Sequence, residues 1–153
     1  MMTDLPPTGR FDGRAHLLPV RIYYEDTDFT GVVYHANYLR YFERGRSDFL
    51  RAAGLDHTAL LGEAEPTAFS VIGINLKFLK PARIDDALVV RTTFDTVQGA
   101  RLAITQSLHK ETAMLARADV EACCINLTGR PKRPPPALVL RLKPFLDPLR
   151  STF

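Results

Sequence analysis

The chain has 153 residues, of which 46% are hydrophobic and 24% charged, and this size and balance fit one globular domain. It can bury a sizeable core without disulfides or metals, and no apolar run approaches the ~18 residues of a membrane-spanning helix. The net charge of +3 fits a polyanionic small ligand, an acidic protein, an anionic membrane surface or plain solvated charge. With no Trp and no long basic run, the sequence does not indicate nucleic-acid binding.

Two features bear on the cellular compartment. The first twenty residues lack the apolar core of a secretory signal. Cys123 and Cys124 are adjacent in a predicted strand, so their side chains should point to opposite faces and not pair with each other. No second cysteine pair is present to build a zinc site. The sequence therefore predicts a reducing, cytoplasmic location, with no metal site.

Residues 1–17 are predicted to form a flexible arm, because proline and glycine punctuate a stretch of low apolar content. The remaining residues, 18–153, are expected to form a single domain. Residues 18–24 fit a first strand. A polar, acidic loop over residues 25–31 follows this strand.

The segment from about residue 36 to 53 fits a long amphipathic helix. Its apolar residues recur at helical spacing, and they are Tyr38, Leu39, Tyr41, Phe42, Phe49, Leu50 and Ala53. Gly54 suits the position just after the helix, where the backbone often turns left-handed. Gly45 lies inside the helix, where glycine costs about 1 kcal/mol relative to alanine, and it suggests a close approach between the helix and a sheet.

After residue 66 the apolar period changes from about 3.6 to about 2 residues, which predicts four half-buried strands. The alternating residues lie in four ranges, 72–78, 88–94, 102–108 and 116–122. Gly99 suits the turn between the second and third of these strands. Strands joined by tight turns pair antiparallel.

A basic, proline-rich connector over residues 129–136 precedes a short predicted helix from about Ala137 to Phe145, broken at Pro144. One amphipathic helix on one face of an antiparallel sheet makes an α+β layer. The sequence therefore predicts a five-stranded antiparallel sheet wrapped around one long central helix, with a short C-terminal helix.

The residues that can carry chemistry concentrate before and within the long helix. Three carboxylates, those of Glu25, Asp26 and Asp28, crowd the loop, and His35 follows at the helix start. Unpaired N–H groups at a helix N-terminus can bind the oxyanion that develops when a carbonyl is attacked. A carboxylate in front of them could attack a thioester or activate water. The same acidic loop also looks like a helix cap, so the residues alone leave both interpretations open.

The string EDTDFTGVVYHANYLRYFERGRSDFL, residues 25–50, resembles the signature of the 4-hydroxybenzoyl-CoA thioesterase family, in its bacterial Tol–Pal-associated acyl-CoA thioesterase branch. LKFLKPARIDDALVVRT, residues 76–92, resembles the second strand pair of that family, so the resemblance covers roughly residues 18–135. It implies the hotdog fold, hydrolysis of acyl-CoA to a free acid and CoA, and no cofactor.

The resemblance also implies roles for single residues. Asp28 matches the catalytic aspartate, as nucleophile or general base, and His35 matches the residue whose backbone N–H polarises the thioester carbonyl. The His35 imidazole either orients Asp28 or water, or it packs or caps the helix. Asp26 is expected to shape the turn, and Asn37 to fix the helix start. Glu43 is expected to pair with a nearby arginine, although another hotdog branch uses a helical glutamate for catalysis.

Coenzyme A carries phosphates, so its site should be basic. The resemblance points to the sheet end that holds four cations, Arg101, Arg130, Lys132 and Arg133, each of which fits plain solvated charge equally well. The acyl pocket is expected under the helix at a subunit boundary, in a homodimer or homotetramer whose sheets pair edge to edge. Phe29 and Thr30 depart from the small residues often found after the catalytic aspartate, which bears on pocket size.

Two other classes of function compete with hydrolysis. A hotdog hydratase or dehydratase pairs an acidic residue with a histidine at a different spacing, which this sequence does not fit. The other alternative is an interaction module of the Tol–Pal system with weak esterase activity. Such a module would act on acyl carrier protein or associate peripherally with the membrane through its basic tail.

Overall fold

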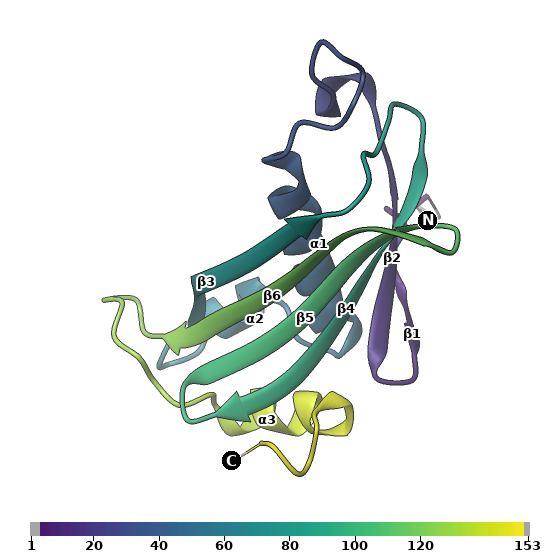
Figure 1. Ribbon diagram of the computed structural model, residues 1–153. Coiled ribbons are helices and arrows are strands. Elements are labelled where there is room, and N and C mark those ends of the chain that lie inside the picture. The colour runs from purple at the N-terminus through teal and green to yellow at the C-terminus, as the bar shows by residue number, and fades with distance from the viewer. Residues whose placement is uncertain (1–3, 152–153) are drawn as a thin grey trace.

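The computed structural model describes residues 4–151, which form one antiparallel sheet packed against one long helix (Figure 1). The strands run in the order β1-β2-β4-β5-β6-β3. Their bounds are Arg10–Asp12 for β1, Ala15–Arg21 for β2, Ala68–Phe78 for β3, Ala87–Gln98 for β4, Arg101–Lys110 for β5 and Ala113–Ile125 for β6. The helical segments are η1 Tyr24–Asp26, α1 Asn37–Ala52, α2 His57–Leu61, α3 Pro136–Leu142 and η2 Lys143–Phe145.

The predicted α+β architecture is confirmed, but the sheet has six strands and the predicted number of five is wrong. The additional strand β1 pairs with β2 through a turn at Gly13, whose φ of 60° favours glycine. Phe11 in β1 stacks on Phe145 and meets Phe49 edge-on. These aromatic contacts join residues far apart in the sequence. Local sequence pattern therefore does not predict the short strand β1.

Helix α1 buries the apolar stripe that the sequence predicted, including Tyr38, Phe42 and Phe49. The close approach expected at Gly45 is confirmed, because an added Cβ there would lie 2.7 Å from Val90 Cγ1 and 2.8 Å from Thr92 Oγ1. Glycine therefore sets the distance between the helix and β4.

A buried polar network lies beside this contact. The Arg46 guanidinium donates to Gln106 Oε1 at 2.8 Å and to the Glu43 carboxylate. The Gln106 amide in turn donates to Phe42 O at 2.8 Å and to Thr92 Oγ1 at 2.9 Å. The ion pair expected for Glu43 is thus confirmed, and the network satisfies the buried Arg46 guanidinium and the buried Gln106 amide.

Strand β3 forms one edge of the sheet. It pairs with β6, and within residues 4–151 no strand pairs with its other edge. Its exposed apolar side chains include Ile72, Ile74 and Phe78. A long edge strand of this kind is a template for pairing with another chain.

The predicted short C-terminal helix is present as α3, and η2 follows it directly. Leu138 and Leu142 of α3 are fully buried, and η2 begins at Lys143, directly before Pro144. Cys123 and Cys124 are both free and buried, so they do not pair, as expected. Within residues 4–151, no helix is long and apolar enough to cross a membrane.

The contact at Gly45 leads to a prediction about stability. Gly45→Ala should gain up to about 1 kcal/mol of helix propensity and lose about 1–3 kcal/mol to overpacking against stiff β-branched side chains. We therefore expect a net loss in the free energy of unfolding, measured by urea denaturation. Arg51→Lys, at an exposed position of the same helix, should leave the urea midpoint unchanged. An unchanged or higher midpoint for Gly45→Ala would contradict the tight contact.

Candidate active site

The acidic loop lies at one end of the molecule, where the chain leaves β2, forms η1 and turns into α1 (Figure 1). Asp26 shapes this loop. Its carboxylate accepts a hydrogen bond from Tyr23 N–H at 2.8 Å, and its carbonyl accepts from Tyr34 N–H at 3.0 Å and from Asn37 Nδ2 at 2.8 Å. The roles expected for Asp26 in the turn and for Asn37 at the helix start are therefore confirmed.

Two tyrosines of α1 contact the acidic loop and the neighbouring β3–β4 connection. Tyr38 Oη accepts a hydrogen bond from Ala82 N–H at 3.2 Å and so ties α1 to the connection between β3 and β4. Tyr41 is buried, and its hydroxyl faces the Asp26 carboxylate. Burial, followed by the negative charge of Asp26, raises the pKa of Tyr41. Tyr41 is therefore a neutral phenol that the loop packs over.

Asp28 is exposed, and one of its carboxylate oxygens is fixed. Thr30 donates both its hydroxyl, at 2.6 Å, and its backbone N–H, at 2.8 Å, to Asp28 Oδ1. These bonds, the hydroxyl bond first, lower the pKa of Asp28 below its ordinary value of 3.8. Among the described residues no side chain donates to Asp28 Oδ2, so this oxygen of the exposed carboxylate can meet a substrate or a water.

The loop around Asp28 is closed by backbone hydrogen bonds. Asp28 N–H donates to Val32 O at 2.9 Å, and Gly31 N–H donates to Asp28 O at 3.0 Å. Gly31 has a φ of 83°, a left-handed conformation that glycine adopts without strain. The sequence marked Thr30 only as a departure from small residues, and the structure shows that its hydroxyl orients the Asp28 carboxylate.

His35 begins the turn that leads into α1. Among residues 4–151 its backbone N–H has no hydrogen-bond acceptor, as is usual for the first N–H groups of a helix. Its ring packs against the Tyr34 ring, with centroids 4.5 Å apart, and lies 6.5 Å from the Phe78 ring. No described hydrogen bond joins the imidazole to Asp28, so of the roles left open for this ring the structure shows packing.

Two hollows that share Glu43 and Arg46 lie along α1 and together form a groove. Leu39 and Ile74 line its shallow part, while Glu43 and Arg46 line both this part and a deeper cavity of about 180 Å³. The cavity walls are mainly apolar, and they include Leu50, Leu61, Phe69, Val71, Phe94, Leu102, Ile104 and Ala122. Ser47 Oγ and His57 Nε2, 3.3 Å apart, also border the cavity.

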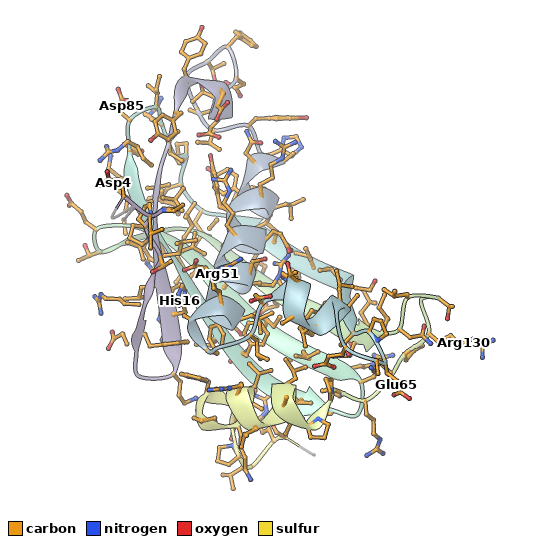
Figure 2. All side chains as sticks on the ribbon, turned by 180° about the vertical axis from the view of Figure 1, so that it is seen from behind. Asp4, His16, Arg51, Glu65, Asp85 and Arg130 are labelled. Atoms are coloured by element: carbon orange, nitrogen blue, oxygen red, sulfur yellow. The ribbon has the colours of Figure 1, made fainter. Side chains whose placement is uncertain are left out.

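The four cations expected to bind CoA lie at the opposite end of the molecule from the acidic loop. Arg101 begins β5 beside the β4–β5 turn, and the other three follow β6 in the connector. Figure 2 labels Arg130 of the connector and Asp85 of the β3–β4 connection, and they lie at opposite ends of the molecule. Within one chain, the structure therefore separates these cations from Asp28.

Two of these cations also have partners of their own. Arg101 pairs with Glu121 at 2.6 Å. Lys132 Nζ donates to Thr67 Oγ1 at 2.9 Å and to Glu65 O at 3.1 Å, so it anchors the connector. Arg130 and Arg133 are exposed.

The sequence matches the family model described as Thioesterase superfamily over residues 30–116, more than half of the chain. The protein therefore belongs to the thioesterase superfamily, with the hotdog fold, and it is a thioester hydrolase. The matched region begins two residues after Asp28, so the family match itself does not test this residue.

Individual relatives agree with this assignment. The chain is 43% identical to the acyl-CoA thioesterase YbgC of Haemophilus influenzae over 71% of this chain and 79% of that protein. It is 39% identical to the acyl-CoA thioester hydrolase YbgC of Escherichia coli O6:H1 over 82% of this chain and 93% of that protein. The structure of a probable thioesterase from Bartonella henselae is 43% identical and superposes with a TM-score of 0.77, covering 79% of this chain and 99% of the other.

The Thr30 hydroxyl bond leads to a prediction about the Asp28 carboxyl. Thr30→Val removes the largest cause of the lowered pKa, so the pKa of Asp28 should rise towards 3.8. Carboxyl-carbon NMR titration measures this directly. Thr128→Val removes a similar hydroxyl bond, to Asn126 Oδ1, and should leave the Asp28 titration unchanged. An Asp28 pKa unaffected by Thr30→Val would show that the bond does not form in solution.

Proposed function

We propose that the protein hydrolyses acyl-CoA thioesters to a free acid and CoA, with Asp28 as the reacting carboxylate. The observation that carries this proposal is an exposed carboxylate, oriented by Thr30, in the loop directly before a turn whose His35 N–H has no acceptor among the described residues. The names of the YbgC relatives support CoA as the thiol part of the substrate.

In the proposed reaction the thioester carbonyl oxygen accepts a hydrogen bond from His35 N–H, which stabilises the oxyanion as it forms. Asp28 Oδ2 either attacks the carbonyl carbon and expels CoA thiolate, leaving an anhydride that water cleaves, or removes a proton from an attacking water. Both routes require an ionised Asp28. Asp28 is ionised at neutral pH, and the bonds from Thr30, which lower its pKa, keep it ionised further into acid.

The groove along α1 is the proposed path of the acyl chain. Leu39 lies one helical turn beyond His35, and the groove it lines ends in the cavity of about 180 Å³. A dry apolar cavity of ~150 Å³ can hold benzene, so this cavity fits about six to eight carbon atoms. We therefore expect a preference for medium-length or single-ring acyl groups.

Two copies are proposed to pair through the free edge of β3. This pairing would cover the exposed Ile72, Ile74 and Phe78 beside the groove. Antiparallel pairing about the middle of β3 would also bring the far end of one copy to the acidic loop of the other. Arg101, Arg130, Lys132 and Arg133 of a second copy are the candidates for contacts with the nucleotide from that side.

A carrier-protein thioester is the alternative acyl donor, and the basic connector with Arg130 and Arg133 is the feature that favours an acidic protein. The proposed location is the cytoplasm, where free thiols persist. A Tol–Pal role with peripheral membrane contact would use the same connector. Comparing hydrolysis of acyl-CoA with that of the matching acyl carrier protein thioester decides which donor is preferred.

The direct test of the proposed reaction is free-thiol release from a panel of acyl-CoAs. Asp28→Asn should lower turnover at least about a hundredfold, because an amide neither attacks nor takes up the proton. Glu25→Gln, a neighbouring loop carboxylate that faces solvent, should keep full activity. A folded Asp28→Asn protein with wild-type turnover would rule out the proposed role.

The edge-paired assembly has its own test in the mass of the particle. Ile74→Glu places a charge on the free edge of β3 and should dissociate the assembly, as measured by light scattering after size exclusion. Leu140→Glu, at an exposed position of α3, should leave the mass unchanged. A monomeric wild type, or an Ile74→Glu protein of wild-type mass, would contradict this interface.

A further inference from the structure

We propose that Lys80 and Arg83, in the connection between β3 and β4, bind the phosphates of CoA at the same end of the molecule as Asp28. This inference rests on the proposed function and specifies which residues hold the nucleotide. It adds a cation pair from the same chain as Asp28 to the far-end cations, which can reach that site only from a second copy.

The β3–β4 connection is hydrogen-bonded directly to the end of the acidic loop. Arg83 forms an antiparallel bridge with Val32, and Val33 N–H donates to Ala82 O at 2.8 Å. Val32 O also accepts the hydrogen bond from Asp28 N–H. Bridged residues have Cα atoms about 4.5–5.5 Å apart, so Arg83 starts one strand spacing from the loop that carries Asp28.

The connection is also held from its other sides. Leu115 O accepts from the backbone N–H groups of Leu79, at 2.8 Å, and Lys80, at 3.1 Å. At the other end, Asp85 N–H donates to Ile22 O at 2.9 Å. The two cations therefore extend from a backbone that is already ordered, which lowers the entropic cost of binding an anion.

Both side chains are available to a ligand. Lys80 and Arg83 are exposed, and among residues 4–151 neither side chain has a hydrogen bond or an ion pair. The nearby carboxylate of Asp86 accepts from Lys110 Nζ at 2.8 Å and from Arg83 N–H at 2.9 Å. The charge of Arg83 helps to lower the pKa of Asp86, but no hydrogen bond or ion pair holds the Arg83 guanidinium among residues 4–151. The guanidinium can therefore turn to a bidentate contact with phosphate.

The distance between the two ends of CoA agrees with this placement. The pantetheine arm between the sulfur and the pyrophosphate has the length of about four peptide units, so it spans at most ~14 Å. When the thioester lies at Asp28, the pyrophosphate of the same CoA therefore lies within ~14 Å of the thioester sulfur. The β3–β4 connection lies at this end of the molecule, whereas Arg130 is at the opposite end (Figure 2).

The test compares two substrates in three proteins. The substrates are an acyl-CoA and the corresponding acyl-pantetheine, which lacks all phosphates. The proteins are wild type, the double variant Lys80→Glu with Arg83→Glu, and the double variant Arg130→Glu with Arg133→Glu, which makes the same charge change at the far end. Binding of free CoA is measured by calorimetry in parallel, and circular dichroism checks that each variant is folded.

We expect the Lys80/Arg83 variant to lose at least about tenfold in kcat/KM for acyl-CoA, mainly through KM, because the lost contacts bind the ground state and the transition state alike. Its kcat/KM for acyl-pantetheine should equal that of wild type. Free CoA should bind at least about tenfold more weakly to this variant, and the effect of the far-end variant should be smaller on both measures.

Two results would overturn the inference. Equal losses on both substrates would show that the substitutions damage the loop and not a phosphate contact. A loss carried by the far-end variant, with the Lys80/Arg83 variant unchanged, would place the nucleotide on a second copy's connector. If wild type hydrolysed neither ester, the proposed function would fail, while the calorimetry would still decide whether Lys80 and Arg83 bind CoA.

Discussion

The packing of α1 on the sheet is the contact on which the rest of the structure depends. Gly45 lets the helix lie directly on β4, and this contact fixes where the helix N-terminus points. The helix start in turn holds the acidic loop, because Asn37 donates to Asp26 O and Tyr38 Oη accepts from Ala82 N–H. One packing contact therefore places a carboxylate, an N–H donor and the β3–β4 connection together.

Different hydrogen bonds give Asp26 and Asp28 different roles in the acidic loop. Asp26 uses its carboxylate and its carbonyl within the protein, so it holds the loop in shape. Asp28 has one oxygen engaged by Thr30, and no side chain of the described residues donates to its other oxygen. Because the engaged oxygen is stabilised in its ionised form, the pKa of Asp28 falls, and the group is charged without burial.

The elements that depend on local pattern could be predicted from the sequence. The helical spacing of Tyr38, Phe42 and Phe49 and the alternation within the four long strands predicted α1 and the core of the sheet. Strand β1 could not be predicted, since it is held by contacts of Phe11 with Phe49 and Phe145, which only the fold brings together.

For the site, the sequence gives residue types and not their bonds. The motif around Asp28 and His35 predicted where chemistry could occur, but not that Thr30 orients the carboxylate. Proximity in the sequence also does not show which end of the sheet a cation occupies. Arg101 and the connector lie opposite the acidic loop, whereas Arg83 is bridged to Val32 within that loop. Such relations follow from strand direction and register, which no single segment encodes.

The most direct test of the account is the pH profile of kcat/KM for a good acyl-CoA substrate, from about pH 3 to pH 7, for wild type and Thr30→Val. The account predicts that activity falls at low pH with the pKa of Asp28, below 3.8 in wild type, and that this fall moves to higher pH in the variant. Only the ionised carboxylate reacts, so a higher pKa of Asp28 makes the activity fall at a higher pH. If the activity of both proteins falls at the same pH although the Asp28 pKa differs between them, another group performs the chemistry.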